Sequence, residues 1–450
     1  MRQNDSYEEQ ILNKAGEELA SIVRTCKRSR WKHKVLRGCC LFLISVICTA
    51  VFWVAYYRID SSIPSCITVR AGMEQTISLC LPAKGRIVSV SSRGKSNIPE
   101  DIKDFDLRKV FTLKMNPDTV CNIQVQLFGF IPFKQIDIVG IEDRELIPLG
   151  IPIGLYVETD GILVVGTAKF EGEDNKQHCP AKNKLRAGDY ILAVDGQPAE
   201  GKEILLDRME ESRGEELSLL VNRDGRKINV SVAPCRDRNG NYRLGLWIRD
   251  NAQGIGTMTY LDSKGEYGAL GHGIADVDTG EIMQLSNGTL YETSIVNIRK
   301  GEPGTPGEIT GMITYADNRI LGTITRNDSG GIHGCCDMSK VGEYLPSPLP
   351  IGFKQEIQKG PAQILCMLDG TRRYYDVEIT AIHLEYDKIN KGIELKVTDQ
   401  NLLDMTGGII QGMSGSPIIQ DGKIIGAVTH VLVNDPERGY GIFIENMLEH

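Results

Sequence analysis

A window of twenty residues without a charged side chain constrains this chain more than any other feature. Gly38–Tyr57 reads GCCLFLISVICTAVFWVAYY. A helix of this length spans about 30 Å, which is the thickness of the hydrocarbon core of a bilayer. A cleaved signal peptide usually has a shorter apolar region followed by small residues, whereas this window ends in bulky aromatic residues. The window therefore predicts an uncleaved transmembrane anchor at residues 38–57.

Charge is distributed unevenly around this window. Residues 1–37 carry a net charge of +4, and residues 24–37 contain seven Lys and Arg but no acidic residue. The positive-inside rule then predicts a cytoplasmic basic tail and an extracytoplasmic body. The body sums to −12 within a total of −8. Because phosphate binding needs clustered cations, this balance argues against a nucleic acid partner.

Residues 58–148 contain short alternating apolar runs, such as TISLCL and CNIQVQLFGF, that are separated by turn residues. This pattern predicts a small β-domain that acts as a spacer or an interaction module. The cysteines of the body have no zinc-binding spacing, so neither a metal nor a cofactor is expected, and free thiols are favoured over disulfides. Their disulfide state is left open at Cys66, Cys80, Cys121, Cys179, Cys235, Cys335, Cys336 and Cys366.

The segment 149–237 has a more specific pattern. It contains LRAGDYILAVDG at Leu185–Gly196, with two strand runs before it and a helical run and two further strand runs after it. This order and this motif resemble those of PDZ domains. The resemblance implies a groove beside an edge strand, where an extended peptide is added as a new strand in cis or in trans. The groove is expected at Ile153, Gly154, Leu155 and Tyr156; the alternative is a domain that packs on a neighbour and binds no free peptide.

Residues 238–450 are rich in glycine and in short strand runs that recur at similar intervals. Such runs predict one or two antiparallel barrels, and this length fits a pair of barrels. The whole chain is therefore expected to be mainly β, with a transmembrane helix, a small β-domain, a PDZ domain and a double β-barrel domain.

A tight loop between strand runs carries the first candidate for chemistry. QGMSGSP at 411–417 resembles the Gly-x-Ser-Gly-x-Pro nucleophile loop of chymotrypsin-like serine peptidases. The similarity implies that Ser414 is the nucleophile and that the N–H groups of Gly412 and Ser414 bind the oxyanion. Ser416 is the competing nucleophile. Met413 stands where secreted digestive relatives have an Asp that pairs with a new N-terminal amine, so activation by that pairing is excluded.

A general base must accompany the nucleophile. His272 lies in the Gly-flanked loop GALGHGIADVDTG after a strand run, and it would belong to the first barrel while Ser414 belongs to the second. It is the favoured base. The orienting carboxylate is left open by spacing, with Asp276, Asp278 and Asp399 as candidates. Asp276 and Asp278 could instead be turn residues that accept backbone hydrogen bonds.

Longer segments narrow the resemblance further. LGLWIRD with GIGTMTYL, the His272 loop, GGIIQGMSGSPIIQDGKIIGAVTHVLVNDP and residues 440–447 are similar to the stage IV sporulation protein B serine peptidases of endospore-forming Firmicutes. This resemblance implies the triad His272, Asp399 and Ser414. It also implies a signalling protease in the forespore intermembrane space, which cleaves the regulator of an intramembrane metalloprotease, activates a late sigma factor and cleaves itself.

Two other functions remain possible from the sequence. One is a non-catalytic PDZ scaffold with a pseudoprotease domain, and the other is a housekeeping protease that degrades misfolded exported proteins. Housekeeping proteases usually carry the PDZ domain after the peptidase domain, whereas here it is expected before it. His430 follows Ser414 on a strand that would flank the specificity pocket. It is expected either to select substrates there or to be a structural residue.

Overall fold

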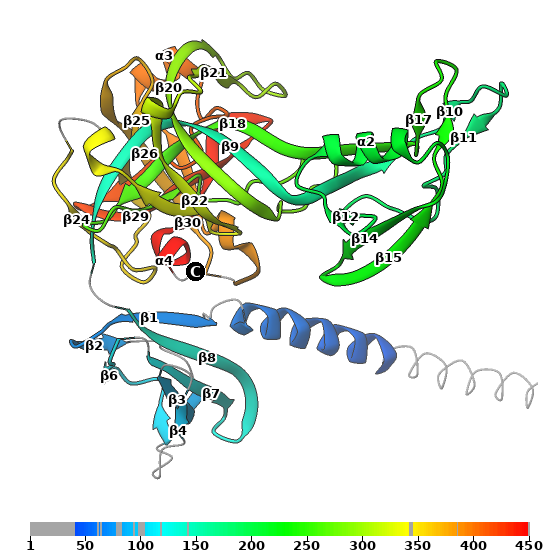
Figure 1. Cartoon of the computed structure of the whole chain (residues 1–450). Coiled ribbons are helices and arrows are strands. Elements are labelled where there is room, and N and C mark those ends of the chain that lie inside the picture. The colour runs from blue at the N-terminus through cyan, green and yellow to red at the C-terminus, as the bar shows by residue number, and fades with distance from the viewer. Residues whose placement is uncertain are drawn as a thin grey trace, which may run out of the picture. The chain divides into compact units, whose positions relative to one another are not determined.

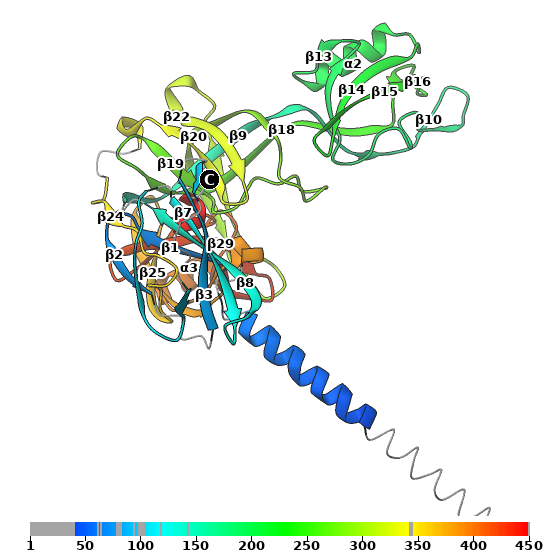
Figure 2. The same ribbon diagram turned by 90° about the horizontal axis from the view of Figure 1, so that it is seen from below.

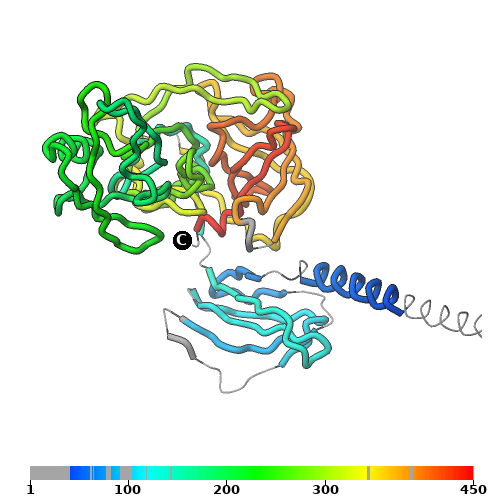
Figure 3. The backbone as a smooth tube through the Cα atoms, turned by 90° about the vertical axis from the view of Figure 1, so that its right-hand side faces the viewer, coloured from blue at the N-terminus to red at the C-terminus, as the bar shows by residue number. Residues whose placement is uncertain are grey.

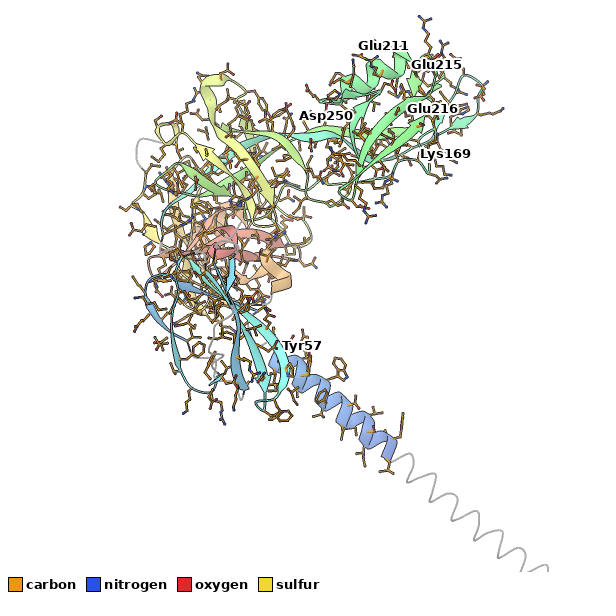
Figure 4. The ribbon with its side chains drawn as sticks, turned by 60° about the horizontal axis from the view of Figure 1, so that its bottom comes forward. Tyr57, Lys169, Glu211, Glu215, Glu216 and Asp250 are labelled. Carbon is orange, nitrogen blue, oxygen red and sulfur yellow. The ribbon has the colours of Figure 1, made fainter. Side chains whose placement is uncertain are left out.

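The computed structural model describes residues 41–60, 63, 65–77, 83–92, 95–97, 104–117, 119–141, 144–341, 345–384 and 386–448. The chain divides into two compact units, Met1–Ile63 and Pro64–His450. The first unit contains a helix over Leu41–Asp60 with a mean hydropathy of 1.8, which is long and apolar enough to cross a membrane. Figure 4 shows the side chains of this helix, including Tyr57, projecting outward. The predicted tail and residues 38–40 lie outside the described residues.

The second unit begins with the small β-domain expected from the sequence. Its sheet has six strands in the order β1-β8-β7-β3-β4, with β5 paired to β3, and β1 runs parallel to β8. Figure 3 shows these strands, coloured blue to cyan, side by side. In β7, buried and partly exposed residues alternate as the sequence pattern requires. The strands of this sheet are β1 (Cys66–Arg70), β3 (Ala83–Ser92), β4 (Lys95–Asn97), β5 (Asp104–Asp106), β7 (Thr119–Leu127) and β8 (Ile131–Ile141), and β2 (Glu74–Ile77) and β6 (Phe111–Lys114) form a separate antiparallel pair.

The first of two barrels follows. Strands β9-β18-β19-β23-β22-β20 are hydrogen-bonded in this order, and β20 pairs again with β9, which closes the ring. Strand β21 forms a hairpin with β20 outside this ring. Apolar side chains such as Leu155, Met258 and Leu290 fill the interior. The strands are β9 (Glu145–Thr167), β18 (Leu246–Leu261), β19 (Glu266–Ala269), β20 (Leu285–Arg299), β21 (Glu308–Ile313), β22 (Ile320–Asp328) and β23 (Gly331–Cys336).

The second barrel is closed in the order β25-β26-β27-β30-β29-β28. Helix α3 (Gln400–Thr406) connects β27 to the loop that carries Ser414, and α4 (Ile444–Leu448) follows the last strand. The double barrel expected from the sequence is thus confirmed. Its strands are β25 (Gly360–Met367), β26 (Arg372–Ile382), β27 (Ile393–Val397), β28 (Pro417–Gln420), β29 (Lys423–Leu432) and β30 (Asp435–Phe443); β24 (Leu349–Pro350) pairs with β9, and short 3-10 helices cover Asp317–Arg319, Met338–Lys340 and Tyr386–Lys391.

A further module is inserted into the first barrel between β9 and β18. The C-terminal half of β9 and the N-terminal half of β18 continue into a sheet with β12, β14 and β15, and Figures 1 and 2 show α2 beside these strands. Asp250 of β18, labelled in Figure 4, accepts a hydrogen bond from the first N–H of α2 at 3.1 Å. The module contains β10 (Phe170–Glu171), β11 (Gln177–His178), β12 (Tyr190–Val194), β13 (Gln197–Pro198), α2 (Lys202–Glu211), β14 (Leu217–Arg223), β15 (Arg226–Val232), β16 (Cys235–Arg236) and β17 (Tyr242–Arg243).

This insertion corrects the boundaries expected at 149–237 and 238–450. The first half of β9 pairs with β18 and β20 and is therefore a barrel strand, although it precedes the inserted module in the chain. The sequence does contain a polar break inside β9, at Glu158-Thr159-Asp160-Gly161. This break separates the part of β9 that pairs with β20 from the part that pairs with β12, but a break in a run does not reveal which strands lie beside each part.

Candidate active site

The two barrels form a cleft of about 630 Å³ that contains both predicted reactive residues. His272 and Gly273 line it from the first barrel, and Gly412, Ser414 and His430 line it from the second. The cleft walls are otherwise mainly apolar, and the residues that line it include no carboxylate. Side chains that are more than a hundred positions apart in the sequence are thus brought together as expected.

Ser414 lies in the loop between α3 and β28, where the backbone passes very close to the first barrel. Gly415 has a φ of +100°, and a Cβ atom there would meet the Thr257 carbonyl oxygen at 2.0 Å. Only glycine fits such a conformation and such an approach. The Gly415 N–H donates to the Val428 carbonyl at 2.7 Å, and Met413 is fully buried in the second barrel. These contacts fix both sides of the nucleophile loop.

The Ser414 hydroxyl is hydrogen-bonded to the backbone rather than to the predicted base. Ser414 Oγ donates to the Thr429 carbonyl oxygen at 2.8 Å, and no hydrogen bond joins it to His272. Hydrogen bonds between nucleophile and base are often absent before substrate binds, so this geometry does not disqualify the pair. For His272 to take the proton, the Ser414 side chain must turn away from Thr429.

The N–H groups predicted to bind an oxyanion are available. Among the described residues, neither the Gly412 N–H nor the Ser414 N–H donates a hydrogen bond to a protein group. The peptide that carries the Gly412 N–H is held on its other side, where the Ile309 N–H donates to the Gln411 carbonyl at 2.8 Å. Two neighbouring free donors in a buried loop are what oxyanion stabilisation requires.

The loop that carries His272 has an unusual backbone. Leu270 and Gly271 both have a φ near +70°, which turns the chain sharply after β19. The Nδ1 atom of His272 lies 3.0 Å from the Gly273 carbonyl oxygen. This contact assigns the ring hydrogen to Nδ1 and leaves Nε2 as the basic nitrogen. Burial lowers the pKa of His272 below its usual value, so the ring is neutral and can accept a proton at neutral pH.

The three candidate carboxylates are all engaged elsewhere. Asp399 caps α3, with its Oδ1 accepting hydrogen bonds from Asn401 N at 2.9 Å and Leu402 N at 3.1 Å. It does not line the cleft and does not contact His272. Asp276 and Asp278 both form ion pairs with Arg249. Asp276 also accepts a hydrogen bond from the Asp278 N–H, as expected if it is a turn residue rather than a member of the triad. The triad role of Asp399 stays a prediction.

Two other sequence expectations concern serine and histidine residues. The side chain of Ser416 is fully buried and does not line the cleft, so a substrate cannot reach this competing nucleophile.

His430 does line the cleft from β29, with its ring centroid 5.3 Å from that of His272. Burial and the nearby His272 and Lys391 lower the pKa of His430 to about 4. Its position fits a role in substrate selection, which stays a prediction.

The peptide groove expected at Ile153–Tyr156 is not possible at that place. These residues pair with β18 on one edge and with β20 on the other, so no edge is free for an added strand. A groove of about 440 Å³ lies instead between α2 and residues 244–248. Residues 246–248 pair only with β9, so their other edge is unpaired. The signal that the sequence interpretation missed is Leu244-Gly245-Leu246-Trp247, an apolar loop with a glycine directly before a strand.

The described residues contain no cluster of His, Cys, Asp and Glu that could hold a metal ion. Free cysteines within them are Cys48, Cys121, Cys179, Cys235, Cys335, Cys336 and Cys366, and Cys335 is exposed. Cys80 lies outside the described residues. The chemical groups of the cleft include Ser414, His272, His430 and the two backbone donors.

A serine in a glycine-flanked loop, a neutral histidine across the same cleft and two free N–H groups define a serine peptidase site on a double barrel. Residues 240–448 match the model of the SpoIVB peptidase S55 family. This match and the geometry of the cleft identify the chain as a serine peptidase, and the matched family is the one that its motifs resemble. The match begins at residue 240, near the end of the inserted module, so it leaves out the barrel strand that β9 supplies.

Comparison with solved structures finds other proteases. The inactive form of the Rv3671c protease is 16% identical, with 43% of this chain and 81% of that chain covered and a TM-score of 0.25. The active form of the same protease, from M. tuberculosis, is also 16% identical, with 44% and 72% covered and a TM-score of 0.25. The HtrA-type protease AlgW with a decapeptide is 12% identical, with 45% and 52% covered and a TM-score of 0.26. No curated protein matches the sequence.

Proposed function

We propose that this chain is a membrane-anchored serine endopeptidase that carries out limited, signalling proteolysis on the extracytoplasmic side during sporulation. The observation that carries the proposal is the shared cleft, in which Ser414 and His272 lie beside the free N–H groups of Gly412 and Ser414. His272 Nε2 takes the proton as Ser414 Oγ attacks the scissile carbonyl, and the two N–H groups bind the resulting oxyanion. His272 then gives the proton to the leaving amine, and water hydrolyses the acyl-enzyme.

The substrate is proposed from the family resemblance to be a regulator of an intramembrane metalloprotease, whose cleavage activates a late sigma factor. The helix Leu41–Asp60 supports this proposal, because a tether raises the effective concentration of the peptidase near a membrane-bound substrate. The chain is also proposed to cleave itself. The site lies in the forespore intermembrane space if the N-terminal tail is cytoplasmic, as its charge predicts.

The groove beside α2 is proposed to bind an extended peptide, in cis or in trans. Leu205, Leu206 and Met209 form its apolar wall on α2, and the unpaired edge of Leu246–Ile248 lies opposite. The Gly245 N–H donates no hydrogen bond within the described residues, so it is available to a carboxylate or a carbonyl of the ligand. Strand addition at such an edge is the mode of binding that the PDZ resemblance implies.

The first test is active-site labelling of the full-length protein in detergent micelles with a fluorophosphonate dye. Wild type and Ser416→Ala should be labelled, and Ser414→Ala should not. Labelling that survives Ser414→Ala would overturn the nucleophile assignment, and an unlabelled wild type would favour the pseudoprotease scaffold. Digestion of casein tests the remaining alternative, a housekeeping protease. Such a protease would degrade casein to small peptides, whereas a signalling protease would cut it little or not at all.

The proposed orientation has its own test. Cys335 is exposed and free on the first barrel, so when the chain is expressed in non-sporulating cells, a membrane-impermeant maleimide applied to intact spheroplasts should label it. The Cys335→Ser variant is the matched control that identifies the labelled thiol. Labelling that requires permeabilised cells would place the peptidase domain in the cytoplasm and would contradict the proposal.

A further inference from the structure

Thr257 of β18 joins the two loops that carry the reactive residues. Its hydroxyl donates to the Gly412 carbonyl at 2.8 Å, and its N–H donates to the Ser414 carbonyl at 3.0 Å. Its own carbonyl accepts a hydrogen bond from the Leu270 N–H at 3.1 Å, at the turn before His272. The hydroxyl, the N–H and the carbonyl of this one buried residue thus all form hydrogen bonds, two to the loop that carries Ser414 and one to the loop that carries His272.

The pairing of β18 explains why these groups are free to do so. Thr257 lies opposite Pro152 of β9, and its N–H and carbonyl both bond to the loops on the other side of β18. In an antiparallel pair, every second residue directs its backbone groups away from the neighbouring strand. The side chain is only 4% exposed, so water cannot substitute for these contacts.

The contact with Gly412 bears directly on the oxyanion donors. Gly412 has a φ of +100°, and a glycine peptide can rotate into many other conformations at little cost. The Ile309 N–H fixes the Gln411 carbonyl before the Gly412 N–H, and the Thr257 hydroxyl fixes the carbonyl after it. Releasing the second anchor would let the Gly412 N–H turn away from the oxyanion position.

We propose that Thr257 is a positioning residue for the peptidase reaction, which sets the oxyanion donors of the nucleophile loop against the His272 loop. Thr257 does not line the cleft, so it acts through Gly412 and Ser414. The proposal rests on the proposed function, because it takes Ser414 as the nucleophile. Loss of its hydroxyl should therefore slow the chemical step and leave the initial binding of a reagent unchanged.

The same strand offers a matched control. Thr259 lies two residues further along β18 and is fully buried, but its hydroxyl has no hydrogen-bond partner within the described structure. Replacing either threonine by valine makes the same isosteric change at a buried site. Only the change at Thr257 breaks a hydrogen bond to the nucleophile loop.

The experiment follows fluorophosphonate labelling of the full-length protein in micelles and separates the maximal labelling rate from the concentration for half-maximal rate. When Ser414 Oγ attacks phosphorus and fluoride leaves, the phosphoryl oxygen occupies the oxyanion position. Thr257→Val is expected to lower the maximal rate by about tenfold, as loss of one buried hydrogen bond predicts, with the half-maximal concentration unchanged. Thr257→Ser should stay within about twofold of wild type, and Thr259→Val should match wild type.

Three outcomes would overturn the proposal. They are an unchanged maximal rate in Thr257→Val, an equal loss in Thr257→Ser, and an equal loss in Thr259→Val. If Thr257→Val does not fold, as judged by its melting temperature, the pair Thr257→Ser and Thr257→Ala makes the same comparison, since these two differ only in the hydroxyl. A wild type that is not labelled at all would instead overturn the proposed function.

Discussion

The imidazole ring of His430 lies against that of His272, with their centroids 5.3 Å apart and their planes inclined by 42°. The two rings come from different barrels and face the same cleft. Burial lowers the pKa of His272, and desolvation in the cleft with the nearby His272 lowers that of His430, although His430 keeps an exposed face. Two neutral imidazoles can lie this close without repulsion, whereas two protonated rings cannot.

The pH dependence of the reaction follows from this pair. Because the pKa of His272 is lowered from 6.5, we expect kcat/KM to be constant above neutrality and to fall only as the pH drops below about 6.5. Stability should change in the same direction. Below about pH 6.5 the unfolded chain binds more protons at His272 than the folded chain does, so the free energy of unfolding decreases as the pH falls. Measuring kcat/KM from pH 8 to pH 4.5 checks the expectation, and an acid limb above 6.5 contradicts it.

His430 is expected to influence which side chain the enzyme accepts next to the scissile bond. Its ring lines the cleft on β29, in a strand that follows the nucleophile loop. A change from a polar ring to a methyl group should alter the ranking of substrates by about tenfold or more. A panel of peptides that differ in this one position, cleaved by wild type and His430→Ala, measures the effect. The same ranking for both enzymes would leave His430 with a structural role only.

Asp399 has two proposed roles that one pair of substitutions can separate. As the N-terminal cap of α3, it should be replaceable by Asn at little cost, while Asp399→Ala should lower the free energy of unfolding by about 1 kcal/mol. Urea unfolding of the two variants measures this difference, and equal stabilities would contradict the capping role.

The activity of the same Asn variant then tests the triad. An orienting carboxylate cannot be replaced by an amide without a loss of about 10⁴ in kcat. Such a loss at unchanged stability would show that Asp399 reaches His272 during catalysis. Retained activity would leave the Gly273 carbonyl as the partner of His272 Nδ1, as in the structure.

Gly415 should tolerate no side chain. A Cβ atom would lie 2.0 Å from the Thr257 carbonyl oxygen and 2.6 Å from the Leu270 N atom, both of which belong to the backbone. We expect Gly415→Ala to abolish activity and to lower the melting temperature. Gly422→Ala is the control, because Gly422 also has a positive φ but no atom within 4 Å of the added Cβ. It should cost about 1 kcal/mol and retain activity, and an equal loss in both variants would contradict the steric argument.

The sequence predicted some parts of this site and not others for physical reasons. Ser414 and His272 were found because glycines flank both, and glycine marks the places where a backbone bends sharply or approaches another chain segment closely. The position of Asp399 was taken from a resemblance, and its cap contacts are local to α3. Thr257 left no signal, because its role depends on three hydrogen bonds to residues distant in the sequence.

The inserted module was misplaced for a related reason. The edge of a sheet is a property of pairing, and a sequence run such as that of β9 does not reveal which strands lie on each side. Ile153–Tyr156 has the apolar character of a groove strand but is paired on both edges. The strand that does have a free edge, Leu246–Ile248, follows the rest of the inserted module in the chain.

The relocated groove makes a final prediction. Leu206 is 45% exposed and lines the groove from α2, so a carboxylate placed there should oppose an apolar or C-terminal carboxylate ligand. We expect Leu206→Glu to weaken binding of apolar C-terminal peptides from a fluorescent library by tenfold or more, as measured by anisotropy. Val296→Glu, an exposed apolar position on β20 outside the groove, should bind as wild type does. Equal binding by wild type and Leu206→Glu would mean that the peptide adds elsewhere, whereas loss confined to Leu206→Glu would place it on the Leu246–Ile248 edge.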